Sequence, residues 1–223
     1  PATRCLFCTD GLALVRELVG QNKGILVLDE VHEWNENMEV LVAWLTKSIA
    51  SGSDMKVVLM SATLEAEKLS AFFDGAPVIS VPGRTFPVTI QAPGSRLIDD
   101  VKTLVEQGRN VLVFQPGKQE IQDVCYALEQ ADVNAEVLPL HGQLSPADQK
   151  LCFAHYGRPK VVVSTNVAQT SVTIDDIDAV VDSGMERRIE LVNGVEGLYL
   201  KPISLADSAQ RKGRAGRIKP GLY

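Results

Sequence analysis

Two adjacent carboxylates follow a short apolar segment in the first part of this 223-residue chain. Residues 24–28, Gly-Ile-Leu-Val-Leu, lead directly into Asp29 and Glu30. If the segment is a buried parallel strand, both acids lie where α/β proteins bind ligands, and Asp29 could hold Mg²⁺ because hard cations prefer oxygen ligands. Glu30 could then deprotonate a water for in-line attack on a phosphate. An acidic strand end that caps a helix explains the two acids equally well.

The hydroxyls of Ser61 and Thr63 follow a second apolar segment. Residues 57–60, Val-Val-Leu-Met, end immediately before Ser61. Hydroxyls at the tip of a neighbouring strand could hydrogen-bond the acidic pair and sense its state. Read alone, both residues are better explained as caps of the helix predicted over 65–73. His32, read alone, is better explained as a strand-end histidine with a structural hydrogen bond.

A basic segment near the C-terminus could act on a phosphoryl group. Residues 210–217 read Gln-Arg-Lys-Gly-Arg-Ala-Gly-Arg. Arg214 and Arg217 are three residues apart, so both would lie on one side of a helical turn. Their permanently charged guanidinium groups suit the charge that develops during phosphoryl transfer. A solvated basic helix end is the simpler explanation, but Gly213 and Gly216 argue against a plain helix because glycine destabilises helix interiors.

Composition and charge limit the class of protein. Apolar residues make up 45% and charged residues 22%, which excludes collagen-like, disordered and disulfide-scaffold proteins. The net charge of −6 argues against a uniformly basic nucleic-acid binder, yet residues 201–223 hold six basic residues and one acid. No apolar stretch reaches the ~18–20 residues of a membrane span, and residues 1–10 lack the features of a signal peptide. We therefore expect a soluble intracellular protein, cytoplasmic or nuclear.

The spacing Cys5-x-x-Cys8 raises the question of a zinc or redox site. A zinc site needs two more ligands, and the sequence contains no second C-x-x-C. Leu6 and Phe7 between the cysteines fit a buried strand, where free cysteine is common. The sequence therefore favours a structural role for this pair.

Short apolar segments alternate with segments of helical period, which predicts an α/β fold with parallel sheets and right-handed crossovers. Several of the apolar segments show little alternation, as expected of strands buried on both faces. Strands are predicted over residues 4–8, 24–28, 56–60, 78–81, 88–91, 110–114, 135–140, 160–164 and 179–182. Helices are predicted over residues 10–19, 38–50, 65–73, 95–107, 118–130 and 146–153.

Two further features predict the domain organisation. Residues 81–87 contain two prolines and a glycine, which is typical of a boundary between α/β units. Segments 189–192 and 198–203 flank Asn193-Gly194, a strong signal for a β-hairpin inserted before the basic segment. We predict part of a first lobe over 1–81, a linker with the first strand of a second lobe over 82–94, and the rest of that lobe over 95–223.

Together these motifs resemble the DEAH-box group of superfamily 2 helicases, and the resemblance covers nearly the whole chain. Asp-Glu-Val-His at 29–32, Ser-Ala-Thr at 61–63 and the basic segment at 210–217 occur in the family's order. Further segments also resemble family motifs, namely residues 9–11, 82–88, 113–117 and 164–175. The resemblance implies two RecA-like lobes, the first truncated, with the hairpin in the second.

The resemblance also implies a use for each motif, with ATP bound between the lobes. Asp29 and Glu30 would hold Mg²⁺, and Glu30 would also be the catalytic base. Gln210 would position the attacking water, and Arg214 and Arg217 would be arginine fingers. Nucleotide binding and coupling would involve His32, Ser61, Thr63, Asp175 and Gly184. Nucleic-acid binding would involve Thr9, Asp10, Gly11, Thr165 and Asn166.

The sequence departs from the family pattern in three places. It contains no G-x-x-x-x-G-K-[ST] loop to hold the β- and γ-phosphates, so we expect this chain alone to hydrolyse no ATP. Trp34 stands where the family usually has arginine, and Gln169 replaces the usual acid of the segment at 164–175. Either substitution could weaken the coupling between ATP and nucleic acid.

The sequence therefore predicts a fragment of an ATP-dependent RNA helicase. We expect a monomer that binds single-stranded RNA with little sequence preference, has no membrane contact and could respond to a protein activator. The missing phosphate loop leaves a non-catalytic RNA-binding or docking module as an alternative for this chain. A DNA-directed translocase is a second alternative, because motifs that contact the sugar-phosphate backbone do not by themselves distinguish RNA from DNA.

Overall fold

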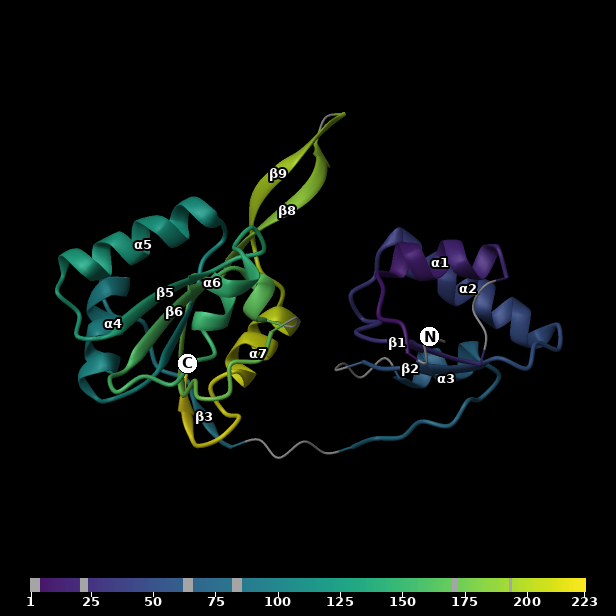
Figure 1. The fold of residues 1–223 in the computed structure, drawn as a ribbon, viewed down its shortest axis with the longest axis horizontal. Helices are drawn as coiled ribbons and strands as arrows, with labels where there is room; N and C mark the ends of the chain where they lie inside the picture. The colour runs from purple at the N-terminus through teal and green to yellow at the C-terminus, as the bar shows by residue number, and fades with distance from the viewer. Residues whose placement is uncertain (1–4, 21–23, 62–65, 82–85, 170–171, 193) are drawn as a thin grey trace. The chain divides into compact units, whose positions relative to one another are not determined.

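The computed structural model describes residues 5–20, 24–61, 66–81, 86–169, 172–192 and 194–223. The chain divides into two compact units, Pro1–Pro82 and Gly83–Tyr223, which we call unit one and unit two and describe separately. Figure 1 shows the elements of each unit. None of the helices in the described part of the chain is both long and apolar enough to span a bilayer.

The described residues of unit one form two parallel strands and three helices. The strands β1 (Ile25–Leu28) and β2 (Lys56–Leu59) pair in register from Ile25 opposite Lys56 to Leu28 opposite Leu59. The helices are α1 (Asp10–Leu18), α2 (Glu36–Ala50) and α3 (Ala66–Phe72). Because the strands are parallel, the residues that follow them, including the predicted acids and Ser61, come to the same edge of the sheet.

The core of unit one lies on one face of this sheet. Leu28 packs with Leu41 and Leu45 of α2 in one buried cluster. The alternate residues Ile25 and Val27 are 70% and 50% exposed. The prediction that such apolar segments are buried on both faces is therefore wrong for β1, because the described helices of this unit cover only one set of its alternating side chains.

Unit two contains a six-stranded parallel sheet in the order β3-β10-β7-β4-β6-β5. Its strands are β3 (Val88–Thr89), β4 (Val111–Phe114), β5 (Glu136–Leu140), β6 (Lys160–Ser164), β7 (Ala179–Asp182) and β10 (Gly221–Leu222). Its helices are α4 (Leu97–Glu106), α5 (Lys118–Gln130), α6 (Pro146–Leu151) and α7 (Leu205–Gly213), with a short 3₁₀ helix η1 (Asn166–Ala168). Parallel strands joined through helices confirm the predicted α/β class.

The central strand β4 is buried on both faces, as the sequence predicted. Val111 and Val113 pack with α4 and α5 in one cluster. Leu112 and Phe114 point to the opposite face and pack in a second cluster with Ala215, which follows α7. All four β4 residues are buried, so β4 is packed between two layers of side chains. The loops described below follow the carboxyl ends of β4 and its neighbours.

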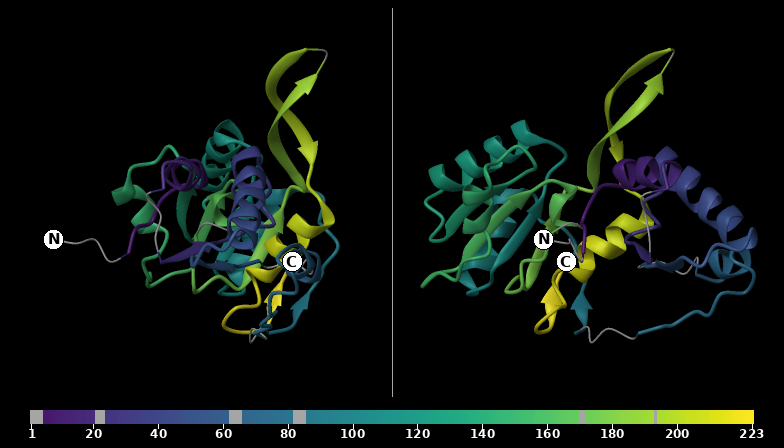
Figure 2. Two further views of the ribbon diagram at one scale, coloured as in Figure 1. Left: turned by 90° about the vertical axis from the view of Figure 1, so that its right-hand side faces the viewer. Right: turned by 45° about the vertical axis from the view of Figure 1, so that its right-hand side comes forward.

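A hairpin stands away from the sheet of unit two, as Figures 1 and 2 show. Its strands β8 (Met185–Val192) and β9 (Val195–Pro202) are antiparallel and pair from Met185 opposite Pro202 to Val192 opposite Val195. The hairpin is longer than the segments predicted at 189–192 and 198–203. Val192 opposite Val195 leaves two residues for the turn, of which Asn193 lies outside the described residues.

Side-chain caps fix where several helices begin. The Asn35 side chain accepts a hydrogen bond from the backbone N–H of Met38 at the start of α2. At α7, Ser204 and Asp207 form a reciprocal capping box, in which each side chain accepts from the backbone N–H of the other residue. Asp207 therefore has a structural task at the start of the helix that carries the basic segment.

Two predicted strands do not form. Residues 5–9 and 76–81 have no regular secondary structure, and Cys5 and Cys8 are exposed rather than buried. An apolar segment becomes a strand only where a neighbouring strand can pair with it, and no described strand pairs with either segment.

The exposure of the cysteines predicts their reactivity. Cys5 and Cys8 are exposed, whereas burial raises the pKa of Cys125 and of Cys152 to about 11. Because the thiolate is the reactive form, a chromogenic disulfide reagent at mildly alkaline pH should modify two thiols quickly and the others only after unfolding. A C5S/C8S variant should lose the fast phase. Four equally fast thiols would contradict the burial of Cys125 and Cys152.

Candidate active site

In unit one, the predicted base, histidine and serine form a connected chain. Glu30 follows β1, and Ser61 follows β2. His32 lies between them, with its Nε2 3.4 Å from Oε2 of Glu30 and its Nδ1 3.3 Å from Oγ of Ser61. The backbone N–H of Val31 donates to the carbonyl of Met60 at 3.0 Å, which holds the loop after β1 against the end of β2. The structure therefore links the two predicted motifs through His32.

The backbone at Glu30 is in the left-handed region, with φ at 52°. Its N–H donates to Oδ1 of Asp29 at 2.9 Å, and its carbonyl accepts from the N–H of Glu33 at 2.8 Å. A residue other than glycine is destabilised in this conformation, and residues strained in this way cluster at functional sites. The turn directs the Glu30 carboxylate to His32.

The carboxylates suit a hard cation only together with other ligands. Asp29 is exposed, and Glu30 is the adjacent acid. In the described part of the chain, no three His, Cys, Asp or Glu side chains are grouped as a complete metal site. Mg²⁺ is usually held by one or two carboxylates together with substrate phosphates and water, so the pair fits that ion. Thr63, also predicted here, lies outside the described residues.

In unit two, Arg214 and Arg217 reach the same loop. Both follow the last residue of α7. Arg214 is buried and donates from Nη1 to the carbonyl of Val172 at 2.8 Å, and from Nη2 to the carbonyl of Gln169. Arg217 is exposed and donates from Nη1 to Oγ1 of Thr173 at 2.9 Å. The structure brings the two guanidinium groups to adjacent loop residues.

Gly216 is explained by close packing. Its carbonyl accepts a hydrogen bond from the N–H of Phe86 at 2.8 Å, just before β3. A Cβ atom at this position would lie 2.6 Å from the carbonyl oxygen of Phe86, so a side chain does not fit. The glycine that argued against a plain helix lets the turn after α7 pack against the start of the sheet.

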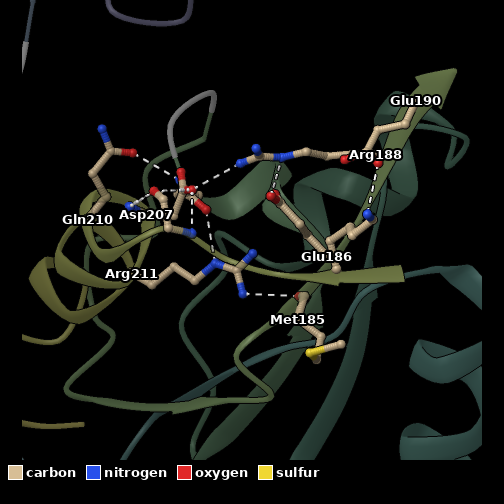
Figure 3. A network of polar contacts seen from close by, with 10 residues as sticks. Met185, Glu186, Arg188, Glu190, Asp207, Gln210 and Arg211 are labelled. Atoms are coloured by element: carbon tan, nitrogen blue, oxygen red, sulfur yellow. Dashed lines mark hydrogen bonds and ion pairs between the residues drawn. The ribbon is translucent and has the colours of Figure 1, made fainter. Parts of the chain in front are cut away.

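Arg211 is the centre of a buried polar network in unit two (Figure 3). Its side chain is 1% exposed and lies over the ring of Phe114, 4.7 Å from the ring centroid. Its Nη1 donates to Oδ1 of Asp182 at 2.8 Å, and its Nε donates to Oε1 of Gln169 at 2.9 Å. The guanidinium therefore joins α7 to β4, β7 and the loop after β6.

Gln169 extends this network to the start of α7. Its amide nitrogen donates to Oδ1 of Asp207 at 2.7 Å and to Oε1 of Gln210 at 3.0 Å. Burial raises the pKa of Asp207, but hydrogen bonds from Ser204 and Gln169 and the charge of Arg188 more than offset it, so the pKa lies below its usual value. Asp207 is therefore an ionised acceptor at neutral pH.

The remaining predicted residues lie on loops or helix ends. Thr165 and the exposed Asn166 follow β6, Asp175 is exposed on the loop before β7, and Gly184 follows β7 with its N–H on Oδ1 of Asp182 at 2.9 Å. In unit one, Thr9 caps α1, because its hydroxyl accepts from the N–H of Leu12, and Asp10 and Gly11 form the first turn. Gly184 therefore shares Asp182 with Arg211, whereas no described side-chain contact joins the other residues of this group to the networks around His32 or Arg211.

Sequence reasoning gave no role to Arg211 or Arg188. Arg188 donates from Nη2 to Oδ2 of Asp207 at 3.4 Å and pairs through Nε with Glu186, so it ties the base of the hairpin to α7. Two adjacent arginines immediately before a predicted hairpin strand were the available signal, because adjacent residues of an extended strand point to opposite faces. Nothing in the sequence signalled that Arg211 would be more deeply buried than Lys212 or Arg217.

The burial of Arg211 predicts a stability effect. Arg211→Lys keeps the charge but loses the planar donors that serve Asp182 and Gln169 together, so we expect a loss of about 2 kcal/mol in the free energy of unfolding. The matched control is Arg158→Lys, whose exposed pair with Glu136 should change stability by less than about 1 kcal/mol. Urea denaturation measures both. Equal losses would contradict a central role for Arg211.

Comparison with known proteins finds a matching family and a similar solved structure. Residues 96–219 match the family described as the helicase conserved C-terminal domain. The crystal structure of the Escherichia coli DEAH/RHA helicase HrpB superposes with a TM-score of 0.82 and 34% sequence identity, covering 96% of this chain and 29% of that one.

The curated relatives are named as known or probable ATP-dependent RNA helicases. The chain is 32% identical to the ATP-dependent RNA helicase HrpA of Escherichia coli, over 96% of this chain and 18% of that protein. It is 36% identical to a probable ATP-dependent RNA helicase, the DHX35 homolog of Caenorhabditis elegans, over 98% of this chain and 34% of that protein. It is 37% identical to human DHX34, also named a probable ATP-dependent RNA helicase, over 99% of this chain and 22% of that protein. The chain therefore spans between about a fifth and a third of these relatives, and it belongs to the DEAH-box helicases of superfamily 2.

Proposed function

We propose that this chain acts within an ATP-dependent RNA helicase, in which ATP hydrolysis drives movement along RNA or separation of its strands. Family membership supports the proposal, and so do the names of the relatives, which are ATP-dependent RNA helicases. We further propose that the active form is a monomer of the cytoplasm or nucleus, open to stimulation by a protein partner, and that it carries a phosphate-binding loop, which the chain itself does not contain.

The observation that carries the proposal is the chain of contacts Glu30–His32–Ser61. A general base must stand within reach of a water, and its orientation must depend on the state of the nucleotide if hydrolysis is to drive motion. His32 can transmit that dependence, because it contacts the base on one side and a hydroxyl after the next strand on the other. A solvated strand end would need no such link.

Asp29 and Glu30 would hold Mg²⁺, which supplies charge neutralisation at the phosphates when it is bound. The Glu30 carboxylate would accept the proton of the attacking water. The contact between Oε2 of Glu30 and Nε2 of His32 would orient that carboxylate before the substrate arrives. Preorganised groups of this kind lower the barrier because they need not reorient during the reaction.

Arg214 and Arg217 would stabilise the negative charge that develops on the phosphate in two different ways. Arg217 is exposed and donates to a neutral hydroxyl, which a phosphate oxygen can replace as a stronger, charged acceptor. Arg214 is buried and donates to two main-chain carbonyls, so its position is fixed by the loop after β6. Arg217 is therefore the better candidate for direct contact, and Arg214 for a fixed positive charge beside it.

RNA would bind through sugar and phosphate contacts. Asn166 and Thr165 lie at the carboxyl edge of the sheet of unit two, while Thr9, Asp10 and Gly11 lie at the start of α1 in unit one. Hydroxyl and amide side chains and the N–H groups of a helix start suit phosphate oxygens and carry little base information, whereas the Asp10 carboxylate can accept from a sugar hydroxyl. The acidic net charge of −6 is compatible with this, because only local contacts are required.

The arginine assignment predicts a loss of catalysis. In an N-terminally extended form that includes a phosphate-binding loop, Arg217→Ala should lower kcat for RNA-stimulated ATP hydrolysis by about 10³-fold or more, because an arginine finger contributes at least about that factor. Arg96→Ala, an exposed arginine before α4, is the matched control and should leave kcat unchanged. A steady-state phosphate-release assay measures both. The 223-residue chain itself should release no phosphate above background, and an active chain would refute the need for the loop.

The RNA assignment predicts salt-sensitive, sequence-tolerant binding. In the extended form, affinity for single-stranded RNA should fall about tenfold or more between about 50 and about 200 mM salt, because phosphate contacts release counterions. Asn166→Ala should weaken binding to uridine-rich and adenosine-rich oligomers equally. Asn134→Ala, an exposed asparagine that precedes β5 at the opposite edge of the sheet, should not.

Filter binding and ATP hydrolysis assays with matched RNA and DNA oligomers test the alternatives. Base-specific, salt-insensitive binding would favour a docking module. Stimulation of ATP hydrolysis by DNA but not by RNA would favour a DNA translocase.

A further inference from the structure

The hydrogen-bond polarity around Gln169 is fixed by its partners. The Nε of Arg211 can only donate, so the atom of Gln169 that lies 2.9 Å from it is the amide oxygen. The amide nitrogen must then face the other way, where Oδ1 of Asp207 lies 2.7 Å from it. An ionised carboxylate can only accept a hydrogen bond, so Arg211 and Asp207 both require the same orientation of the Gln169 amide.

This orientation determines how Gln210 is turned. The second hydrogen of the Gln169 amide nitrogen points at Gln210, so Gln210 must present its oxygen, which lies 3.0 Å away. Its amide nitrogen is then directed away from Asp207 and Arg211, as Figure 3 shows. A carboxylate at position 169 would instead accept from Gln210 and turn the opposite end of that side chain outward.

We propose that Gln169 is a positioning residue that turns Gln210 so that its amide N–H, rather than its oxygen, serves the terminal phosphate of ATP. The inference rests on the proposed ATP hydrolysis, and it changes the task expected of Gln210 from positioning the attacking water to donating a hydrogen bond to phosphate. Gln169 itself touches no substrate. It acts through Gln210, and Asp207 and Arg211 hold it in place.

A double-mutant cycle separates this positioning role from a structural one. Gln169→Glu places a carboxylate oxygen against Oδ1 of Asp207, and Asp207→Asn places an amide nitrogen against that of Gln169, so each single variant should melt several degrees below the parent. In Q169E/D207N, the amide nitrogen introduced at position 207 can donate to the carboxylate introduced at position 169. The amide oxygen at position 207 can still accept from Ser204 and Arg188, which bond to Oδ2 of Asp207 in the parent. The double variant of the 223-residue chain should regain most of the melting temperature.

Nucleotide binding then reports on Gln210. In the extended form of Q169E/D207N, Gln210 presents its oxygen, so affinity for a non-hydrolysable ATP analogue should fall about tenfold, as expected for one hydrogen bond to a charged group. Affinity for ADP, which lacks the terminal phosphate, should stay unchanged. The matched control is Gln119→Glu on α5, where the amide donates to exposed Asp123 at 2.9 Å in the same way. It should alter neither the melting temperature nor the ratio of the two affinities.

Each outcome decides something. If the double variant melts like the parent and binds both nucleotides in the parent ratio, Gln169 is structural only and the inference is wrong. If the double variant melts no higher than the single variants, the assigned polarity is wrong. If the parent extended form binds neither nucleotide, the proposed function fails and the inference with it. A fall in affinity for the ATP analogue alone, with stability restored, supports the inference.

Discussion

The architecture of unit two depends on one buried guanidinium. Arg211 lies over the ring of Phe114 and binds the carboxylate of Asp182 and the amide of Gln169, so it connects two central strands, a loop and a helix. A charge at this depth is tolerated only when its donors have partners, because an unpaired buried charge is strongly destabilising. The position of α7, and with it that of Arg214 and Arg217, therefore follows from where Asp182 and Gln169 stand.

The second constraint is the parallel direction of the strands. In both units, the residues after neighbouring strands meet at one edge, which is why Glu30 and Ser61 come together through His32 although they are far apart in the sequence. The same geometry gathers the loops after β4, β6 and β7 in unit two. The sheet topology brings these residues close together. Local hydrogen bonds, such as the one from the N–H of Glu30 to Asp29, set the conformation of the loops that carry them.

Much of this could be predicted from the sequence, because apolar segments followed by polar motifs report strands and their carboxyl ends. The parallel α/β fold and the placement of Glu30 and Ser61 after neighbouring strands are of this kind, and Asn193-Gly194 predicted the hairpin. Sequence reasoning expected the hydroxyls to bond the acidic pair directly and did not foresee His32 between Glu30 and Ser61. The strand predicted around Cys5 and Cys8 failed because apolar character alone does not supply a pairing neighbour. The network around Arg211 could not be foreseen, because the burial of Arg211 and Arg214 but not of Arg217 depends on packing between elements distant in sequence.

The base of the hairpin is connected to the Arg211 network by an ion pair. Arg187 and Arg188 are adjacent on β8, so they point to opposite faces of the ribbon. Arg187 pairs with Glu120 of α5 at 2.6 Å, and Arg188 reaches Asp207 of α7. Both faces of the hairpin are therefore bound to unit two, and Asp207, which binds one of them, also accepts a hydrogen bond from Gln169. A tilt of the hairpin in the plane of these contacts would stretch the bond to Asp207, whose other oxygen fixes the amide beside Gln210. The base of the hairpin and the side chain proposed to serve the terminal phosphate are therefore separated by only two residues, Asp207 and Gln169, joined by hydrogen bonds.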